Sequence, residues 1–159
     1  METIEQSIEV QVPLTMAYEQ WIRFEEFPEF MEGVEEVRRL GDQRLHWVAE
    51  IAGRHHEWDA VITEQRRDER VAWRNTDGKD NAGVVTFHRI DDDSTRLMVQ
   101  MDFLPEGIAE HLGAAIGAPD RRVKGDLERF KAMIEERATD AGVWRVEDGE
   151  TKRPVEDRR

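Results

Sequence analysis

Five histidines, two serines and no cysteine limit the metal and covalent chemistry open to this chain of 159 residues. His55 and His56 are adjacent, so on an extended strand their side chains point to opposite faces. No HExxH or comparable spacing occurs and no thiolate is present, so we expect neither a metal site nor a cofactor. Ser7 and Ser94 lie outside any GxSxG motif, which argues against an acyl-enzyme mechanism.

Acid–base chemistry needs a titratable group inside a pocket. The sequence offers His56, His88 and Tyr18 as candidates, and each is equally compatible with a structural or exposed position. With 36 Asp and Glu residues, composition cannot single out a catalytic carboxylate. The residues alone leave open whether the chain is an enzyme.

Large apolar side chains indicate a second kind of chemistry, the binding of an apolar molecule. In the segment WIRFEEFPEF, four rings alternate with glutamates that we expect to face water. Either the inward-facing rings and aliphatic side chains fill a core, or some line a pocket for a flat or chain-like ligand. The candidates for ligand contact are Trp21, Phe24, Phe27, Phe30, Trp47, Trp58, Trp73, Phe87, Val99, Met101, Phe103, Leu127 and Phe130.

Polar residues continue the alternation beyond two of these tryptophans. His56 and Arg54 precede Trp58 at alternate positions, and Asn75 follows Trp73 in the same way. These three side chains either end their strands in solvent or lie at a pocket mouth, where they would orient a ligand carbonyl or hydroxyl.

A net charge of −13 repels phosphate backbones, so nucleic acid is not an expected partner. The basic residues Arg121, Arg122 and Lys124 lie among acids and indicate a solvated helix face. No stretch approaches the roughly 18 apolar residues of a membrane span. The N-terminal METIEQSIEV does not resemble a signal peptide and cysteine is absent, so we expect a cytoplasmic protein whose oligomeric state stays open.

Alternation of apolar and polar residues predicts a first strand at 3–12, followed by two short helices. The first helix runs from Thr15, as its N-cap, to about Ile22, and the second from Phe24 to Met31 with a break near Pro28. Six closely spaced strands then predict an antiparallel meander. Their expected ranges are 34–40, 44–51, 55–65, 70–75, 83–90 and 95–103.

From Glu106 onward the periodicity becomes helical, with an interruption around residues 113–119. Apolar residues recur at spacings of 4, 3 and 4 in a single stripe, at Val123, Leu127, Phe130 and Ile134. We therefore predict an α+β domain over residues 1–142, followed by a charged, disordered tail at 143–159. About seven strands form a curved antiparallel sheet wrapped on the long helix, with room for a cavity between them.

Three segments together carry a family resemblance: VPLTMAYEQWIRFEEFPEFMEGVEEV, LHWVAEIAGRHHEWDAVITEQRRDERVAWRN and GDLERFKAMIE. Over about residues 2–139 the chain resembles the helix-grip superfamily called START-like or SRPBCC. It looks most like the bacterial polyketide cyclase/dehydrase and lipid transport group. The segment Phe27-Pro28-Glu29-Phe30 is also similar to the coenzyme Q-binding branch.

This resemblance implies a helix-grip fold whose central cavity binds apolar or aromatic small molecules. We expect the chain to bind or transport a lipid, quinone or polyketide-like molecule without covalent chemistry. One alternative is a polyketide cyclase/dehydrase-type enzyme in which a His or Tyr of the cavity moves a proton. A second alternative is a protein-interaction module with a filled core.

Overall fold

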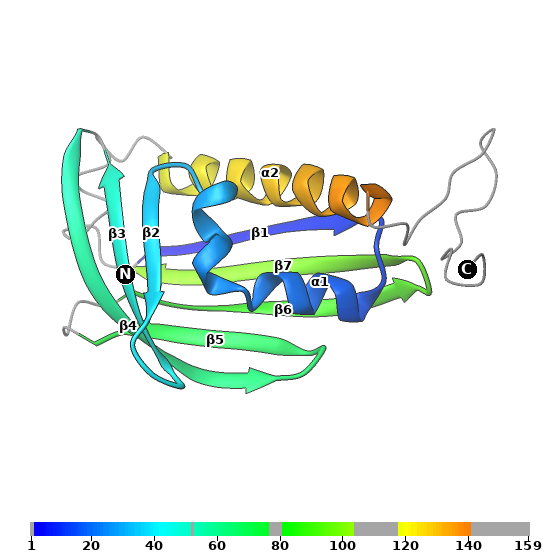
Figure 1. Cartoon of the computed structure of the whole chain (residues 1–159), viewed down its shortest axis with the longest axis horizontal. Coiled ribbons are helices and arrows are strands. Elements are labelled where there is room, and N and C mark those ends of the chain that lie inside the picture. The colour runs from blue at the N-terminus through cyan, green and yellow to red at the C-terminus, as the bar shows by residue number, and fades with distance from the viewer. Residues whose placement is uncertain (1, 52, 77–80, 104–117, 141–159) are drawn as a thin grey trace.

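The computed structural model describes residues 2–51, 53–76, 81–103 and 118–140. Its strands form one antiparallel sheet in the order β1-β7-β6-β5-β4-β3-β2 (Figure 1). The six-stranded meander β2–β7 is confirmed, and β1 joins it by pairing with β7. Each strand begins and ends within two residues of the expected position. The strands are β1 (Glu2–Val10), β2 (Val34–Arg39), β3 (Arg44–Ile51), β4 (Arg54–Arg66), β5 (Arg70–Asn75), β6 (Asn81–Asp91) and β7 (Ser94–Phe103).

The two short helices follow β1 as expected, but their details differ. Helix α1 (Leu14–Trp21) begins after Pro13, which gives no side-chain cap. Thr15 is not the N-cap, because its hydroxyl instead donates a hydrogen bond to Asp68 in the β4–β5 turn, at 2.9 Å. The second element, η1 (Phe24–Glu29), is a 3-10 helix that contains Pro28.

The long helix α2 (Ala118–Asp140) lies over the concave face of the sheet and runs along β1 (Figure 1). Its buried stripe consists of Leu127, Phe130, Ile134 and Ala138. The earlier helical positions 106–117 and the tail 143–159 lie outside the described residues. No helix in the described ranges is long and apolar enough to cross a membrane.

Rings from three elements hold α2 in place. The Phe130 ring lies 5.2 Å from Trp21 and 5.1 Å from Phe30, centroid to centroid. Phe27 continues the cluster to Trp47 of β3 at 5.5 Å. Because burying one such ring contributes about 1.5–3 kcal/mol, the cluster fixes both short helices against the sheet and α2.

Two of the interleaved glutamates, which the sequence predicts to face water, instead accept hydrogen bonds from α2. The Arg137 guanidinium of α2 donates hydrogen bonds to Glu26 and Glu29, each at 2.5 Å, and a third to Gln20 at 3.1 Å. The bond from Arg137 is the main reason that the pKa of Glu26 lies below its ordinary value. Glu25 is exposed. The polar side of η1 therefore ties this element to α2.

Hydrogen bonds from α2 side chains to backbone carbonyls extend this attachment along both sides of the helix. Lys131 Nζ donates to the Glu9 carbonyl of β1 at 2.9 Å, and Arg129 Nε donates to the Phe30 carbonyl at the same distance. Arg122 donates to the Glu32 carbonyl at 3.0 Å, so one member of the predicted basic surface is engaged in this contact. The helix is thereby held at the β1 edge and at the η1 end.

Gly83 of β6 makes room for a large ring of the neighbouring strand. Its register partner is Trp73 of β5. A Cβ atom at Gly83 would lie 2.5 Å from Trp73 Cζ2. The indole therefore lies directly over the glycine, and this position accepts no side chain without movement of Trp73.

We expect Gly83→Ala to lower the free energy of unfolding by about 1–3 kcal/mol, because the added methyl group overpacks the site. Urea unfolding would measure this loss. Gly41→Ala is the matched control, since a Cβ at Gly41 meets nothing within 4 Å. Equal losses in the two variants would contradict the contact between Trp73 and Gly83.

Candidate functional site

Strand register assigns the inner side chains of the sheet. Trp47 of β3 pairs with Trp58 of β4, and Trp73 of β5 pairs with Gly83 of β6. Val99 of β7 belongs to the core under α2 and pairs with Val85. Because side chains alternate along a strand, these positions all lie on the concave face.

One part of the concave face is packed solid. Eight of the predicted ligand-contact residues are at most 5% exposed and belong to one core cluster. These side chains leave almost no surface accessible to solvent. The eight are Trp21, Phe24, Phe27, Phe30, Phe87, Val99, Leu127 and Phe130.

The other part of the concave face keeps apolar surface accessible. Trp47, Trp58, Trp73 and Met101 are half-buried. The Trp47 and Trp58 rings are stacked, with planes 10° apart and centroids 5.6 Å apart, which is an offset arrangement. Among the predicted contacts whose side chains the structure describes, these four keep accessible surface, although Trp47, Trp73 and Met101 also pack against the core. The side chain of the thirteenth candidate, Phe103, lies outside the described part of the structure.

A pocket of about 550 Å³ opens where η1, the start of β2, the β3–β4 hairpin and α2 meet. Phe30, Met31 and Val34 supply its apolar lining, and Glu35 and Glu50 are among its acids. Phe30 also belongs to the core cluster, so the pocket adjoins the aromatic interior. None of the four half-buried side chains lines this pocket, and we propose that it forms the outer mouth of the groove because it adjoins Phe30 of the core.

Acidic charge predominates at this mouth. The lining includes four glutamates and a single arginine, Arg129. That arginine already donates to Asp126 at 2.5 Å and to the Phe30 carbonyl. Gly33, beside the pocket, has a φ of +86°. A Cβ there would lie 2.8 Å from the Glu50 carbonyl oxygen. Because glutamates predominate in the lining, the electrostatic potential at the mouth disfavours an anionic ligand.

The polar residues predicted for the mouth differ in burial. Arg54 is exposed at the start of β4. His56 is half-buried on the concave face, opposite Ala49 of β3. Asn75 is buried opposite Ala60. His56 and Asn75 therefore do not lie in open solvent, which was one of the two positions expected for them.

The three acid–base candidates occupy different environments. Tyr18 is buried, and its ring meets the edge of Phe87 at 5.5 Å. His88 is exposed and bonded to Thr86, one position from the inward-facing Phe87, so it points away from the groove. His56 alone among these three lies on the half-open part of the concave face.

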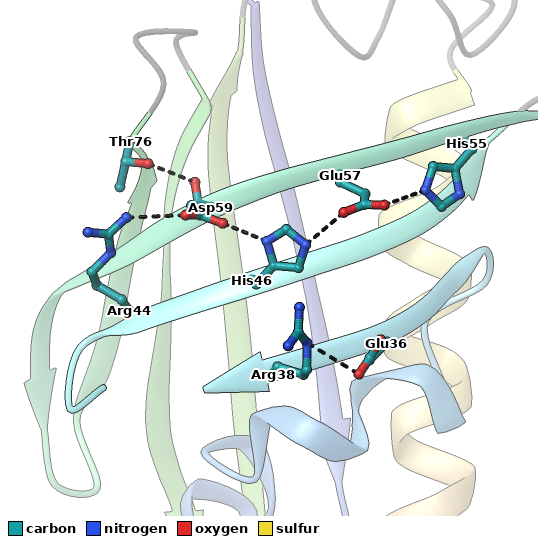
Figure 2. Close-up of polar contacts among 8 residues, drawn as sticks. All are labelled: Glu36, Arg38, Arg44, His46, His55, Glu57, Asp59 and Thr76. Atoms are coloured by element: carbon teal, nitrogen blue, oxygen red, sulfur yellow. Dashed lines mark hydrogen bonds and ion pairs between the residues drawn. The ribbon is translucent and has the colours of Figure 1, made fainter. Parts of the chain in front are cut away.

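A polar network that sequence reasoning did not identify lies on the outer face of the same hairpin (Figure 2). His46 Nδ1 lies 2.6 Å from Asp59 Oδ1, and His46 Nε2 lies 2.9 Å from Glu57 Oε1. Glu57 also contacts His55 at 2.6 Å, and Arg44 donates to Asp59 at 3.2 Å. The i, i+2 spacing of Glu57 and Asp59 becomes informative only when the β3–β4 register is known.

This network shifts the pKa values of its members. The hydrogen bond to Asp59, followed by the bond to Glu57, raises the pKa of His46 above its ordinary 6.5. The bond to His46 lowers the pKa of Asp59, and bonds to His55 and His46 lower that of Glu57. No group of three or more His, Asp or Glu side chains in the described ranges is arranged to hold a metal ion.

These shifts predict a pH-dependent contribution to stability. The His46 contribution is present below about pH 6.5 and is lost as pH rises through the raised pKa of the folded state. The carboxylate contribution is present above the ordinary values of 3.8 for Asp59 and 4.5 for Glu57, and is lost as pH falls. The stability difference between wild type and His46→Gln should therefore be largest between these limits and shrink towards alkaline pH. Urea unfolding across a pH series would measure it.

His88→Gln is the matched control, because His88 is an exposed histidine bonded to a hydroxyl on the same face of the sheet. A pH-independent difference for His46→Gln, or the same profile in both variants, would contradict a role for the network.

Comparison of the sequence with known families gives one match over most of the domain. The family model described as "Polyketide cyclase / dehydrase and lipid transport" matches residues 10–132. A protein of Streptomyces lincolnensis, described as an uncharacterized 17.2 kDa protein, is 53% identical over 146 residues. That alignment covers 91% of this chain and 97% of the relative.

Solved structures share the fold at low sequence identity. An aromatase/cyclase from a Streptomyces species superimposes with a TM-score of 0.76 at 19% identity, covering 89% of this chain and 98% of the other. A START superfamily protein from Mycobacterium smegmatis gives a TM-score of 0.65 at 15% identity, covering 87% and 98%. A Deinococcus radiodurans protein gives 0.68 at 23% identity, covering 86% and 99%. These similarities confirm the predicted helix-grip fold.

Proposed function

The chain belongs to the polyketide cyclase/dehydrase and lipid transport family, and on this premise we propose that it binds a hydrophobic small molecule between the sheet and α2 without covalent chemistry. The ligand is a lipid, a quinone or a polyketide-like molecule. The absence of cysteine suits a reducing compartment and fits a cytoplasmic carrier.

The observation that carries this proposal is the uneven packing of the concave face. Trp47, Trp58, Trp73 and Met101 keep part of their apolar surface accessible, while the neighbouring core excludes water. Such surface is unfavourable in water and becomes favourable once a ligand covers it. Indole rings also offer stacking, which suits a flat ligand.

Charge at the mouth supports an uncharged ligand. A free carboxylate or a phosphate would approach Glu35 and Glu50 without a counter-charge from Arg129, which is engaged by Asp126. Neutral aromatic or prenyl-like molecules meet no such repulsion. The proposal therefore favours a neutral molecule over a free fatty acid.

A cyclase or dehydratase reaction is the second candidate, and the position of His56 is the observation that favours it. An imidazole on the half-open part of the concave face can exchange a proton with a bound molecule. A conversion that is lost in His56→Gln, while ligand affinity is retained, would support this function over simple carriage.

We expect Trp58→Ala and Phe130→Ala to separate binding from packing. Trp58→Ala removes half-exposed ring surface and should weaken binding of a neutral aromatic probe about tenfold, with little change in melting temperature. Phe130→Ala removes a fully buried ring and should lower the free energy of unfolding by about 3–5 kcal/mol. Isothermal titration calorimetry and thermal unfolding on both variants would give the two quantities.

Native mass spectrometry of the purified wild-type chain provides an independent measurement, because a carrier should retain or take up an apolar guest. A wild-type chain that takes up no apolar probe would contradict the proposal. Equal effects of Trp58→Ala and Phe130→Ala on stability, with none on binding, would also contradict it.

A further inference from the structure

One hydrogen-bond donor on the concave face has no acceptor. The indole Nε1 of Trp47 is buried, and it has no hydrogen-bond partner in the described part of the structure. An indole nitrogen is a donor only, so it cannot be satisfied by another N–H group. A buried donor without an acceptor is unfavourable, because it has lost its hydrogen bond to water.

The surroundings of Trp47 explain why the protein itself supplies no acceptor. Its ring is stacked on Trp58 and lies 5.5 Å from Phe27, centroid to centroid. Val37 of β2 is its register partner on the other side and is also apolar. These three neighbours of Trp47 offer no side-chain acceptor, and the residue itself belongs to the half-open part of the concave face.

We infer that the Trp47 indole N–H selects the ligand, by donating a hydrogen bond to an oxygen at the edge of a planar, uncharged aromatic molecule. This inference rests on the proposed function, because it assigns a specificity-determining residue to the same groove. The ligand class becomes narrower, since a ring with a ketone or similar oxygen is preferred over a plain hydrocarbon of the same shape.

The two kinds of ligand differ in whether the buried Trp47 N–H gains a hydrogen-bond acceptor. A ligand oxygen that accepts the bond removes an existing cost, whereas a hydrocarbon leaves the donor buried and unpaired. The Trp47 ring is half-buried while its Nε1 is buried, so the inference requires the indole to reorient when the ligand enters and bring Nε1 within reach of the ligand oxygen. The stack with Trp58 supplies a flat surface for the same molecule.

The test compares 9-fluorenone with fluorene, two planar tricyclic probes that differ chiefly in one carbonyl oxygen. Wild type should bind fluorenone about 5- to 10-fold more tightly than fluorene, measured by isothermal titration calorimetry. Trp47→Phe keeps an aromatic ring and removes the donor, so it should abolish this preference while changing fluorene affinity less than about twofold. Trp58→Phe is the matched control, and it should weaken both probes equally.

An NMR measurement reports the bond directly and does not depend on a variant. In ¹⁵N-labelled wild type the five tryptophans give indole N–H resonances that triple-resonance experiments assign. The Trp47 resonance should move downfield with fluorenone and not with fluorene. A merely structural Trp47 would show no such difference between the probes.

The outcomes separate this inference from the proposed function. Equal affinity for both probes, a preference that survives in Trp47→Phe, or an unshifted Trp47 resonance would overturn the inference and leave the carrier function standing. If neither probe binds wild type, the inference fails; the proposed function fails with it when native mass spectrometry also shows no uptake of any apolar guest.

Discussion

The contact of Phe130 with Trp21 and Phe30 is the interaction on which the rest of the structure depends, because it joins α2, α1 and the end of η1 at one point. Burial of these rings supplies free energy that hydrogen bonds alone could not, since each protein bond replaces one to water. The polar contacts around it, above all Arg137 with Glu26 and Glu29, then fix direction. Helix α2 therefore has one position on the sheet, and the concave surface left uncovered is determined with it.

That position divides the concave face into a fully buried part and a partly exposed part. Near α1 and the C-terminal half of α2, aromatic and aliphatic side chains pack to exclusion of solvent. Towards the β3–β4 hairpin the same face carries tryptophans that keep accessible surface, and the acidic pocket adjoins it. The packed half stabilises the fold, while the partly open half keeps apolar surface that a ligand could cover. The unfavourable exposure of apolar surface is thus confined to one part of the domain.

The β3–β4 hairpin carries one cross-strand contact on each face of the sheet. Trp47 and Trp58 stack on the inner face, and their neighbours His46 and Asp59 are bonded on the outer face. Both pairs belong to the same strand register, so a shift of that register would break both contacts.

By itself, the sequence determined the element order, the antiparallel meander and the apolar stripe of α2, because these depend on local periodicity and turns. The family was predicted from the resemblance of three segments and not from periodicity. It did not predict the role of Glu26, the hydrogen bond of Thr15 to Asp68, or the outer network of His46, because each joins residues far apart in the chain. For the site, alternation placed Trp47, Trp58 and Phe87 on the inner face correctly but could not distinguish the packed ring from the half-open ones. Only the tertiary structure decided that difference, because accessible surface depends on where α2 and η1 lie over the sheet, and side-chain periodicity carries no information about that distance.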